Sequence, residues 1–178
     1  YFLILSGDQL YQMHFEEMLR FAEETEADVV VASVAVDEIS AKRMGILKVD
    51  ALGMIQNFIE KPQSKASLEP LRIPGSLLEN VKDPSCNYLG SMGIYLFKKE
   101  VLLKLLEEDP REDFGKHLIP TMVKKGNAAS YVFPGYWEDL GTVDAFYKAN
   151  MSLTQEKPEF DLTSEVFPLH TSYQSLPP

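Results

Sequence analysis

Two aspartates stand at positions where a divalent cation could be held. Asp8 comes just after the apolar segment 1–5 and a turn residue, Gly7. Asp139 lies between a predicted strand and a helix that begins near Thr142. Carboxylate oxygens, together with substrate phosphates, are the ligands that Mg²⁺ prefers. The alternative is that each aspartate only caps a turn or favours the N-terminus of the helix that follows it.

A glutamate and a lysine at the end of another apolar strand could bind a phosphorylated polyol. Glu60 and Lys61 end the segment 53–61, and Pro62 predicts an extended backbone at the residue before it. A lysine ammonium can act as a point charge on a phosphate, and a glutamate can accept hydrogen bonds from hydroxyl groups. The alternative is a solvated charge pair, because exposed pairs of this kind are common and weak.

Two glycines lie within the strand-like segment 89–97. Gly90 and Gly93 flank Ser91 and Met92. Glycine inside a strand marks a bulge or a close approach by a ligand, and the Ser91 hydroxyl could hydrogen-bond to a sugar. Packing of a helix against the sheet would explain the glycines equally well.

Strand and helix patterns alternate along the chain. Strands are predicted at 1–5, 28–36, 45–50, 53–61, 87–97 and near 129–134. Helices are predicted over 14–26, 99–108, 114–125 and from Thr142 to about Gln155. Residues 62–86 carry four prolines and predict a long loop. This alternation predicts a layered α/β fold with a mainly parallel sheet, in which ligands bind beyond the carboxyl ends of the strands.

Three of these elements carry more detailed expectations. The apolar run 1–5, which follows no initiator methionine, predicts a buried strand in the middle of a sheet and a longer parent protein. Segments 45–50 and 53–61 predict a hairpin, with Ile46, Lys48 and Asp50 on its solvent-facing side. Asp113 is the expected N-cap of the helix over 114–125.

The composition of the 178 residues excludes several classes of protein. The formal net charge is -10, and no run of lysine or arginine exceeds two residues, which argues against a nucleic-acid binder. No apolar stretch approaches the roughly 20 residues of a membrane-spanning helix. Cys86 is the single cysteine, so an internal disulfide is impossible and a reducing compartment is expected.

Taken in order, the motifs resemble those of the glucose-1-phosphate adenylyltransferases, or ADP-glucose pyrophosphorylases. The matching motifs are LSGD-x-LY at 5–11, EKP at 60–62, SMGIY-x-F at 91–97, DFG-x-x-x-IP at 113–120 and YW-E-D-x-GT at 136–142. Other sugar nucleotidyltransferases share the GD and W-x-D-x-GT motifs, whereas the remaining motifs are more selective for the ADP-glucose branch. The resemblance covers essentially all 178 residues.

The resemblance implies a Rossmann-like nucleotidyltransferase fold with a mainly parallel mixed sheet. Residues 1–155 would form the C-terminal part of the catalytic domain. Residues 156–178, with four of the eleven prolines, would form an extended linker. Phe167-Pro168 and the terminal Ser175-Leu176-Pro177-Pro178 are similar to the family's connection into a left-handed β-helix domain.

The family transfers an adenylyl group from ATP to glucose 1-phosphate, giving ADP-glucose and pyrophosphate, in glycogen or starch synthesis. The resemblance implies that Asp8 and Asp139 are catalytic carboxylates that hold Mg²⁺. Lys61 would contact the sugar phosphate. The residues implied to bind glucose 1-phosphate are Gly45, through its backbone, Glu60, Lys61, Ser91 and Asp113.

The resemblance also implies properties of the intact enzyme. The family's GG-x-G-x-RL loop, which binds the triphosphate, would precede residue 1, so the chain alone is expected to be inactive. The intact enzyme would be an allosteric homo- or hetero-tetramer in the bacterial cytoplasm or a plastid, without nucleic-acid or membrane partners. The alternatives are another sugar-1-phosphate nucleotidyltransferase that uses UTP, dTTP or GTP, and a non-catalytic regulatory subunit of a hetero-oligomer.

Overall fold

The computed structural model describes residues 1–78, 81–109, 111 and 113–158. The chain divides into two compact units. The first consists of Tyr1–Ser6 and His14–Pro134, and the second of Gly7–Met13 and Gly135–Pro178. In the described ranges, no helix combines the length and the apolar character needed to cross a membrane.

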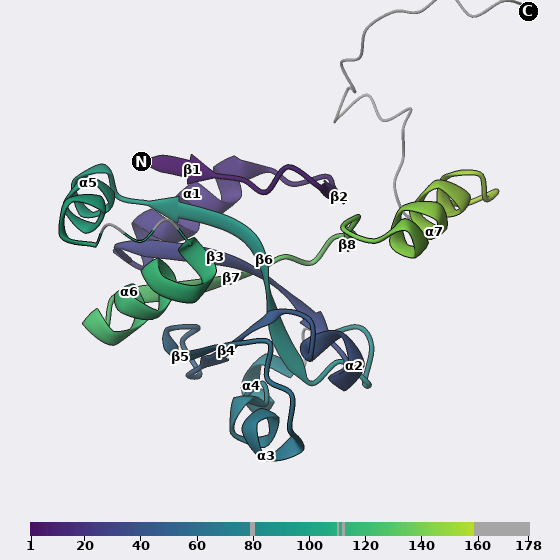
Figure 1. Cartoon of the computed structure of the whole chain (residues 1–178), viewed down its shortest axis with the longest axis horizontal. Helices are drawn as coiled ribbons and strands as arrows, with labels where there is room; N and C mark the ends of the chain where they lie inside the picture. The colour runs from purple at the N-terminus through teal and green to yellow at the C-terminus, as the bar shows by residue number, and fades with distance from the viewer. Residues whose placement is uncertain (79–80, 110, 112, 159–178) are drawn as a thin grey trace, which may run out of the picture. The chain divides into compact units, whose positions relative to one another are not determined.

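The first unit is built on a six-stranded mixed sheet (Figure 1). Its strands are β1 (Phe2–Ile4), β3 (Val29–Val36), β4 (Gly45–Val49), β5 (Ile55–Glu60), β6 (Tyr88–Phe97) and β7 (Ala128–Val132). Five of them follow the order β5-β4-β6-β3-β7, and β1 pairs with the last residues of β6. The predicted α/β class with a mixed sheet is confirmed, as is the β4–β5 hairpin.

Strand directions in this sheet explain why most pairs are antiparallel. β1, β3 and β4 all pair antiparallel with β6, and β7 runs parallel to β3. Four of the six strands run in one direction, but the expectation of a mainly parallel sheet is wrong for the strand pairs, which are mostly antiparallel. β6 runs the other way between them, so β3–β7 is the one parallel pair among the described strands.

The expectation that residues 1–5 form a buried strand in mid-sheet is wrong both for burial and for position in the sheet. Phe2 and Leu3 are 42% and 37% exposed, and Tyr1 and Leu5 are also exposed. β1 pairs with β6 and, within the described residues, with no other strand. The apolar run therefore predicts the strand itself but not how it is covered.

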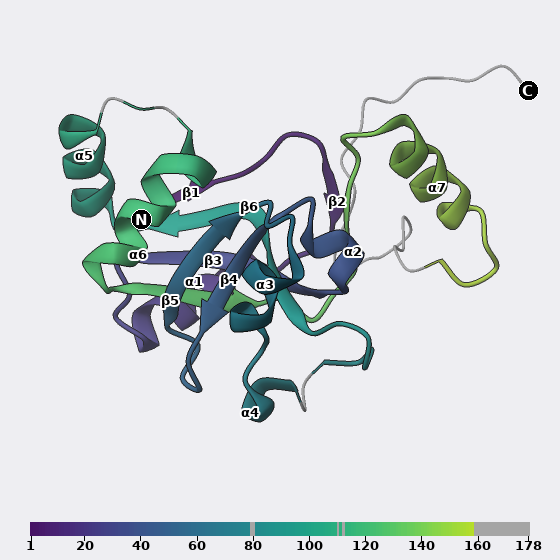
Figure 2. The same cartoon turned by 60° about the horizontal axis from the view of Figure 1, so that its bottom comes forward.

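Helices of the predicted lengths pack on the sheet. α1 (Phe15–Glu24) buries Met18 and Ala22, and α5 (Lys99–Glu108) matches its predicted range. The helix expected over 114–125 begins with a π-helical turn, η2 (Phe114–Leu118), and continues as α6 (Ile119–Lys125). α6 lies beside β5 (Figure 2), and both α5 and α6 contribute to the main core.

The prediction of a long loop over 62–86 is wrong for much of that range. It contains α3 (Lys65–Leu68), η1 (Glu69–Leu71) and α4 (Gly75–Leu78), and another short helix, α2 (Glu38–Ala41), precedes β4. Leu68 and Leu71 are buried in a second core cluster together with Ile46. Ile46 is therefore buried, contrary to the expected solvent-facing side, whereas Lys48 is exposed. Helices of three or four residues are too short to show a periodic sequence pattern.

Within its described residues, the second unit contains a two-stranded ribbon and one helix. β2 (Gln9–Tyr11) pairs antiparallel with β8 (Trp137–Asp139), and neither strand was predicted. α7 (Val143–Leu153) follows as expected, and the Thr142 hydroxyl caps it by accepting a hydrogen bond from the Ala145 N–H at 3.2 Å. Most of the expected linker, with Phe167-Pro168 and Ser175–Pro178, lies outside the described residues.

Candidate active site

The two aspartates expected to hold a cation lie side by side in the second unit. The β2–β8 register places Gln9 opposite Asp139, and the Leu140 N–H donates to the Asp8 carbonyl oxygen at 2.9 Å. A Cβ atom placed on Gly141 would lie 3.0 Å from Asp139 Oδ1 and 3.7 Å from Asp8 Oδ2. Both carboxylates therefore border the same glycine.

Several contacts fix this arrangement. The Gly141 N–H donates to Asp139 Oδ1 at 2.9 Å and orients the carboxylate. The Trp137 indole N–H donates to Gln9 Oε1 at 3.2 Å, across the ribbon. Asp139 lies in a strand and not in the turn that was expected, because the β2–β8 pairing continues to it.

Helix capping does not explain either aspartate. α1 begins at Phe15 with His14 at its N-cap position, well after Asp8. The N-cap of α7 is Thr142 and not Asp139. In the part of the chain that the structure describes, no group of three or more histidine, cysteine, aspartate or glutamate side chains is placed to hold a metal ion. A pair of carboxylates is nevertheless a donor set that fits Mg²⁺, which usually keeps several waters and takes its other ligands from substrate phosphates.

A second group of predicted residues meets in the first unit. Glu60 and Gly45 are directly opposite each other in the β4–β5 hairpin. A Cβ atom on Gly45 would lie 2.8 Å from Glu60 Oε2 and 2.3 Å from the Phe58 ring, so both side chains would have to shift to admit one. A Cβ atom on Gly115 would lie 3.6 Å from Glu60 Oε2 and 3.7 Å from Asp113 Oδ1. The two carboxylates therefore approach the same stretch of backbone at the start of η2.

Asp113 has the capping role that the sequence predicts. Its carboxylate accepts a hydrogen bond from the Lys116 N–H at 2.9 Å and forms an ion pair with the Lys116 ammonium at 3.2 Å. The backbone hydrogen bond is the main reason why the pKa of Asp113 is lowered. The same carboxylate borders Gly115, so capping and proximity to Glu60 are both features of this residue.

Ser91 lies at a bulge in β6. The β3–β6 register shifts between the pairs Val31–Tyr95 and Ser33–Ser91, and Gly93 within this stretch has a φ of 69°. The bulge that the glycine predicts is therefore present. The Gly93 N–H donates to the Ser91 hydroxyl at 3.3 Å. Gly90, by contrast, packs against the Met44 side chain.

Tyr95 belongs to this group, although the sequence analysis did not single it out. Its buried ring stacks on Phe114 with the centroids 5.9 Å apart. Burial raises the pKa of the Tyr95 phenol, a hydrogen bond with Ser91 opposes this, and the charges of Glu60 and Asp113 add to the increase. The phenol is thus in the electrostatic environment of three predicted sugar-binding residues.

Lys61 departs from the backbone conformation that its sequence predicts. Its φ is 48°, in the left-handed region, whereas Pro62 predicts an extended chain. The expectation of an extended backbone is therefore wrong at this residue. The Lys61 ammonium lies 3.9 Å from Glu60 Oε1, and its side chain is 59% exposed. The ammonium is available to an anionic ligand beside Glu60.

The two groups offer complementary chemistry. The carboxylates of Asp8 and Asp139 can hold a hard cation. The carboxylate of Glu60, the Ser91 hydroxyl and the Lys61 ammonium can bind hydroxyl groups and a phosphate. Among the described residues, Gly141 and Tyr95 are the additions to the sequence prediction.

Comparison with protein families supports the interpretation of this chain as part of a transferase. The family model described as "Nucleotidyl transferase" matches residues 1–156, which is most of the chain. The matched range includes both the carboxylate pair of the second unit and the polar group of the first. The α/β fold with its mixed sheet is that of a Rossmann-like nucleotidyltransferase domain. The chain therefore belongs to the nucleotidyl transferase family.

Proposed function

We propose that the protein transfers an adenylyl group from ATP to glucose 1-phosphate, producing ADP-glucose and pyrophosphate. The observation that supports a sugar phosphate as substrate is the group around Glu60, which combines carboxylates, a hydroxyl and the exposed Lys61 ammonium. A phosphorylated sugar needs acceptors for its hydroxyl groups and a cation for its phosphate. The family match supports nucleotidyl transfer as the reaction.

The residues of the first unit bind and orient the sugar phosphate in this proposal. Glu60 and Asp113 accept hydrogen bonds from sugar hydroxyl groups, and Ser91 supplies a hydroxyl near the Tyr95 phenol. Lys61 binds the phosphate through its ammonium. Because the sugar phosphate is already anionic at neutral pH, no general base is required.

The residues of the second unit hold the cation. Asp8 and Asp139 would bind Mg²⁺ through oxygens that border Gly141. The ion, when bound, neutralises the charge of the phosphates and aligns the attacking and leaving groups. In the reaction, an oxygen of the sugar phosphate forms a bond to the α-phosphorus of ATP. The bond between that phosphorus and the α–β bridging oxygen breaks, and pyrophosphate leaves.

The choice of ATP and glucose rests on the motifs that are selective for the ADP-glucose branch. These are EKP at 60–62, SMGIY-x-F at 91–97 and DFG-x-x-x-IP at 113–120. The same resemblance supports a role in glycogen or starch synthesis, and a tetrameric, allosterically regulated enzyme in a bacterial cytoplasm or a plastid. All of these belong to the proposal.

A panel of nucleotides tests the proposal. The intact protein is incubated with glucose 1-phosphate, Mg²⁺ and ATP, UTP, dTTP or GTP, and the nucleotide sugar is measured by chromatography. The proposal predicts that ADP-glucose forms fastest. Preference for another base would identify a different sugar nucleotidyltransferase, and no product with any nucleotide would favour a non-catalytic regulatory subunit.

Replacing Gly45 with alanine is expected to weaken sugar-phosphate binding. The new methyl group would meet Phe58 and the Glu60 carboxylate at distances of 2.3 and 2.8 Å, so the carboxylate must move. We expect the KM for glucose 1-phosphate to rise by about 10-fold, the lower range for a hydrogen bond to a charged group. The change also costs about 1–3 kcal/mol of stability through overpacking.

Gly75→Ala is the matched control for this variant. A Cβ atom on Gly75 meets no other atom within 4 Å, so the KM and the melting temperature should stay unchanged. Equal KM values for Gly45→Ala and the wild type would contradict the expectation that displacing the Glu60 carboxylate weakens sugar-phosphate binding.

A further inference from the structure

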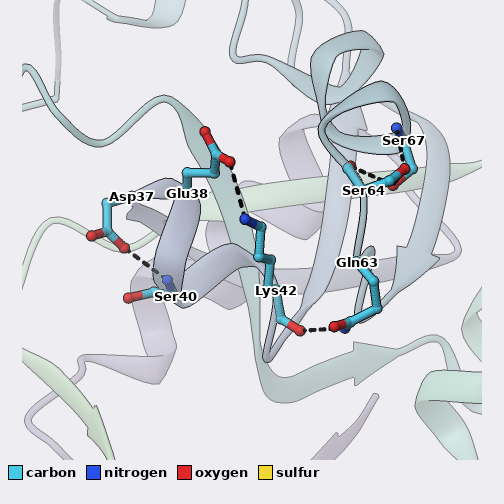
Figure 3. Close-up of polar contacts among 7 residues, drawn as sticks. All are labelled: Asp37, Glu38, Ser40, Lys42, Gln63, Ser64 and Ser67. Carbon is cyan, nitrogen blue, oxygen red and sulfur yellow. Dashed lines mark hydrogen bonds and ion pairs between the residues drawn. The ribbon is translucent and has the colours of Figure 1, made fainter.

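One exposed glutamine holds two backbone carbonyl groups of the first unit. The Gln63 side-chain amide donates to the carbonyl oxygen of Lys42 at 2.9 Å and to that of Lys61 at 2.8 Å. Lys42 is the C-cap residue of α2. Figure 3 shows the Gln63 side chain directed at the Lys42 carbonyl. The amide therefore links the end of α2 to the segment that follows β5.

The second of these carbonyls belongs to a residue with an unfavourable backbone. Lys61 has a φ of 48° and precedes a proline, and few non-glycine residues adopt this conformation. Its N–H donates to the Met44 carbonyl oxygen at 3.0 Å. Its carbonyl oxygen accepts from Gln63. Both polar backbone groups of Lys61 thus form hydrogen bonds with residues outside β5.

The left-handed conformation decides where the Lys61 ammonium lies. In a regular strand, the side chains of consecutive residues point to opposite faces of the sheet. Glu60 and Lys61 would then be directed away from each other. The turned backbone instead leaves Lys61 Nζ 3.9 Å from Glu60 Oε1. The conformation of one residue therefore brings the ammonium to the carboxylate of the sugar-binding group.

The segments on both sides of Gln63 are themselves anchored (Figure 3). The Asp37 carboxylate caps α2 by accepting from the Ser40 N–H at 2.8 Å. The Lys42 ammonium bonds to Glu38 at 3.1 Å along the same helix. Ser64, directly after Gln63, caps α3 by accepting from the Ser67 N–H at 3.1 Å. Gln63 therefore connects two capped helices and can resist a change in the backbone between them.

We infer that Gln63 is a positioning residue for sugar-phosphate binding, because its amide holds the Lys61 backbone in the conformation that places the ammonium beside Glu60. This inference rests on the proposed function, in which Lys61 binds the sugar phosphate. Gln63 itself touches no substrate in this account.

Gln63→Met tests the inference, because methionine has a similar length and no hydrogen-bond donor. Gln63 is exposed, so the variant should fold. The first measurement is hydrogen–deuterium exchange of the Lys61 amide in the full chain without ligand. Loss of a net-favourable neutral hydrogen bond predicts about 2- to 12-fold faster exchange.

The second measurement is the affinity of the intact protein for glucose 1-phosphate by isothermal titration calorimetry. Gln63→Met should weaken binding by about the same 2- to 12-fold and leave the kcat at saturating substrate unchanged. The control is Gln56→Met, which removes a comparable exposed amide that donates to Asp50 at 2.9 Å. It should alter neither measurement.

The outcomes separate this inference from the proposed function. Unchanged exchange at Lys61 in Gln63→Met would show that the glutamine does not hold its backbone. Wild-type affinity in Gln63→Met, with loss of affinity in Lys61→Ala, would overturn the positioning role and leave the proposed function intact. A wild-type protein that does not bind glucose 1-phosphate would instead overturn the proposed function, and with it the role of Gln63 in binding.

Discussion

Replacing Asp8 with asparagine is expected to lower kcat by about 10²- to 10⁴-fold, the range for loss of a preorganised electrostatic group. Asparagine keeps the size of the side chain and removes the negative charge that a bound cation needs. The loss should fall on kcat, because stabilisation by the cation grows as charge shifts in the transition state. Steady-state kinetics at saturating Mg²⁺ measures it.

The location of Asp8 in the second unit defines the controls. The KM for glucose 1-phosphate should change little, because Glu60 and Lys61 belong to the first unit. The melting temperature should also stay near that of the wild type, because asparagine can accept the same backbone hydrogen bonds as aspartate in a turn. Glu138→Gln is the matched control and should leave kcat near that of the wild type. It neutralises the carboxylate directly before Asp139, whose side chain lies on the opposite face of the ribbon. Near-normal kcat in Asp8→Asn would show that Asp8 only stabilises its turn.

Replacing Lys61 with alanine is expected to raise the KM for glucose 1-phosphate by about 10- to 150-fold, which corresponds to one charge-assisted hydrogen bond. The KM for ATP should change far less, because Lys61 is assigned to the sugar phosphate. Initial rates with each substrate varied in turn distinguish the two constants.

Lys48→Ala is the control for this prediction. Lys48 is another exposed lysine of the same hairpin, opposite Asn57 and away from the Gly45–Glu60 end. Its removal should leave both KM values near those of the wild type. If Lys61→Ala raised the KM values of both substrates equally, Lys61 would have a structural role and its assignment to the phosphate would be wrong.

Long elements could be predicted from the sequence, whereas most short ones could not; the three-residue strand β1 is an exception, because an apolar run marks it. The helix α5 and the strands β3 and β6 each extend over eight to ten residues and show a clear apolar pattern. The helices α3 and α4, of four residues each, show none. The three-residue strands β2 and β8 are also too short for a period of two to be visible. The prediction that β1 is buried failed for a different reason. The burial of a strand depends on the elements that pack against it and not on its own residues alone.

In the candidate site, too, some features could be predicted from the sequence and others could not. Asp8, Asp139 and Glu60 could be proposed because carboxylates after strands have a limited set of roles. That Asp8 and Asp139 meet depends on the β2–β8 pairing of segments far apart in the sequence. Lys61 shows where a local rule fails, because the hydrogen bonds from Gln63 and to Met44 accompany a conformation that Pro62 disfavours. The Met44 contact joins segments that are distant in the sequence and cannot be deduced from the residues beside Lys61.

The most direct measurement for the central claim follows the phosphate oxygens through the reaction. Glucose 1-phosphate labelled with ¹⁸O at every phosphate oxygen is incubated with the intact protein, Mg²⁺ and ATP, and the products are analysed by mass spectrometry. Attack of the sugar phosphate on the α-phosphorus predicts that ADP-glucose retains the entire label and that pyrophosphate contains none. Labelled pyrophosphate, or AMP formed while the label stays in glucose 1-phosphate, would contradict the account.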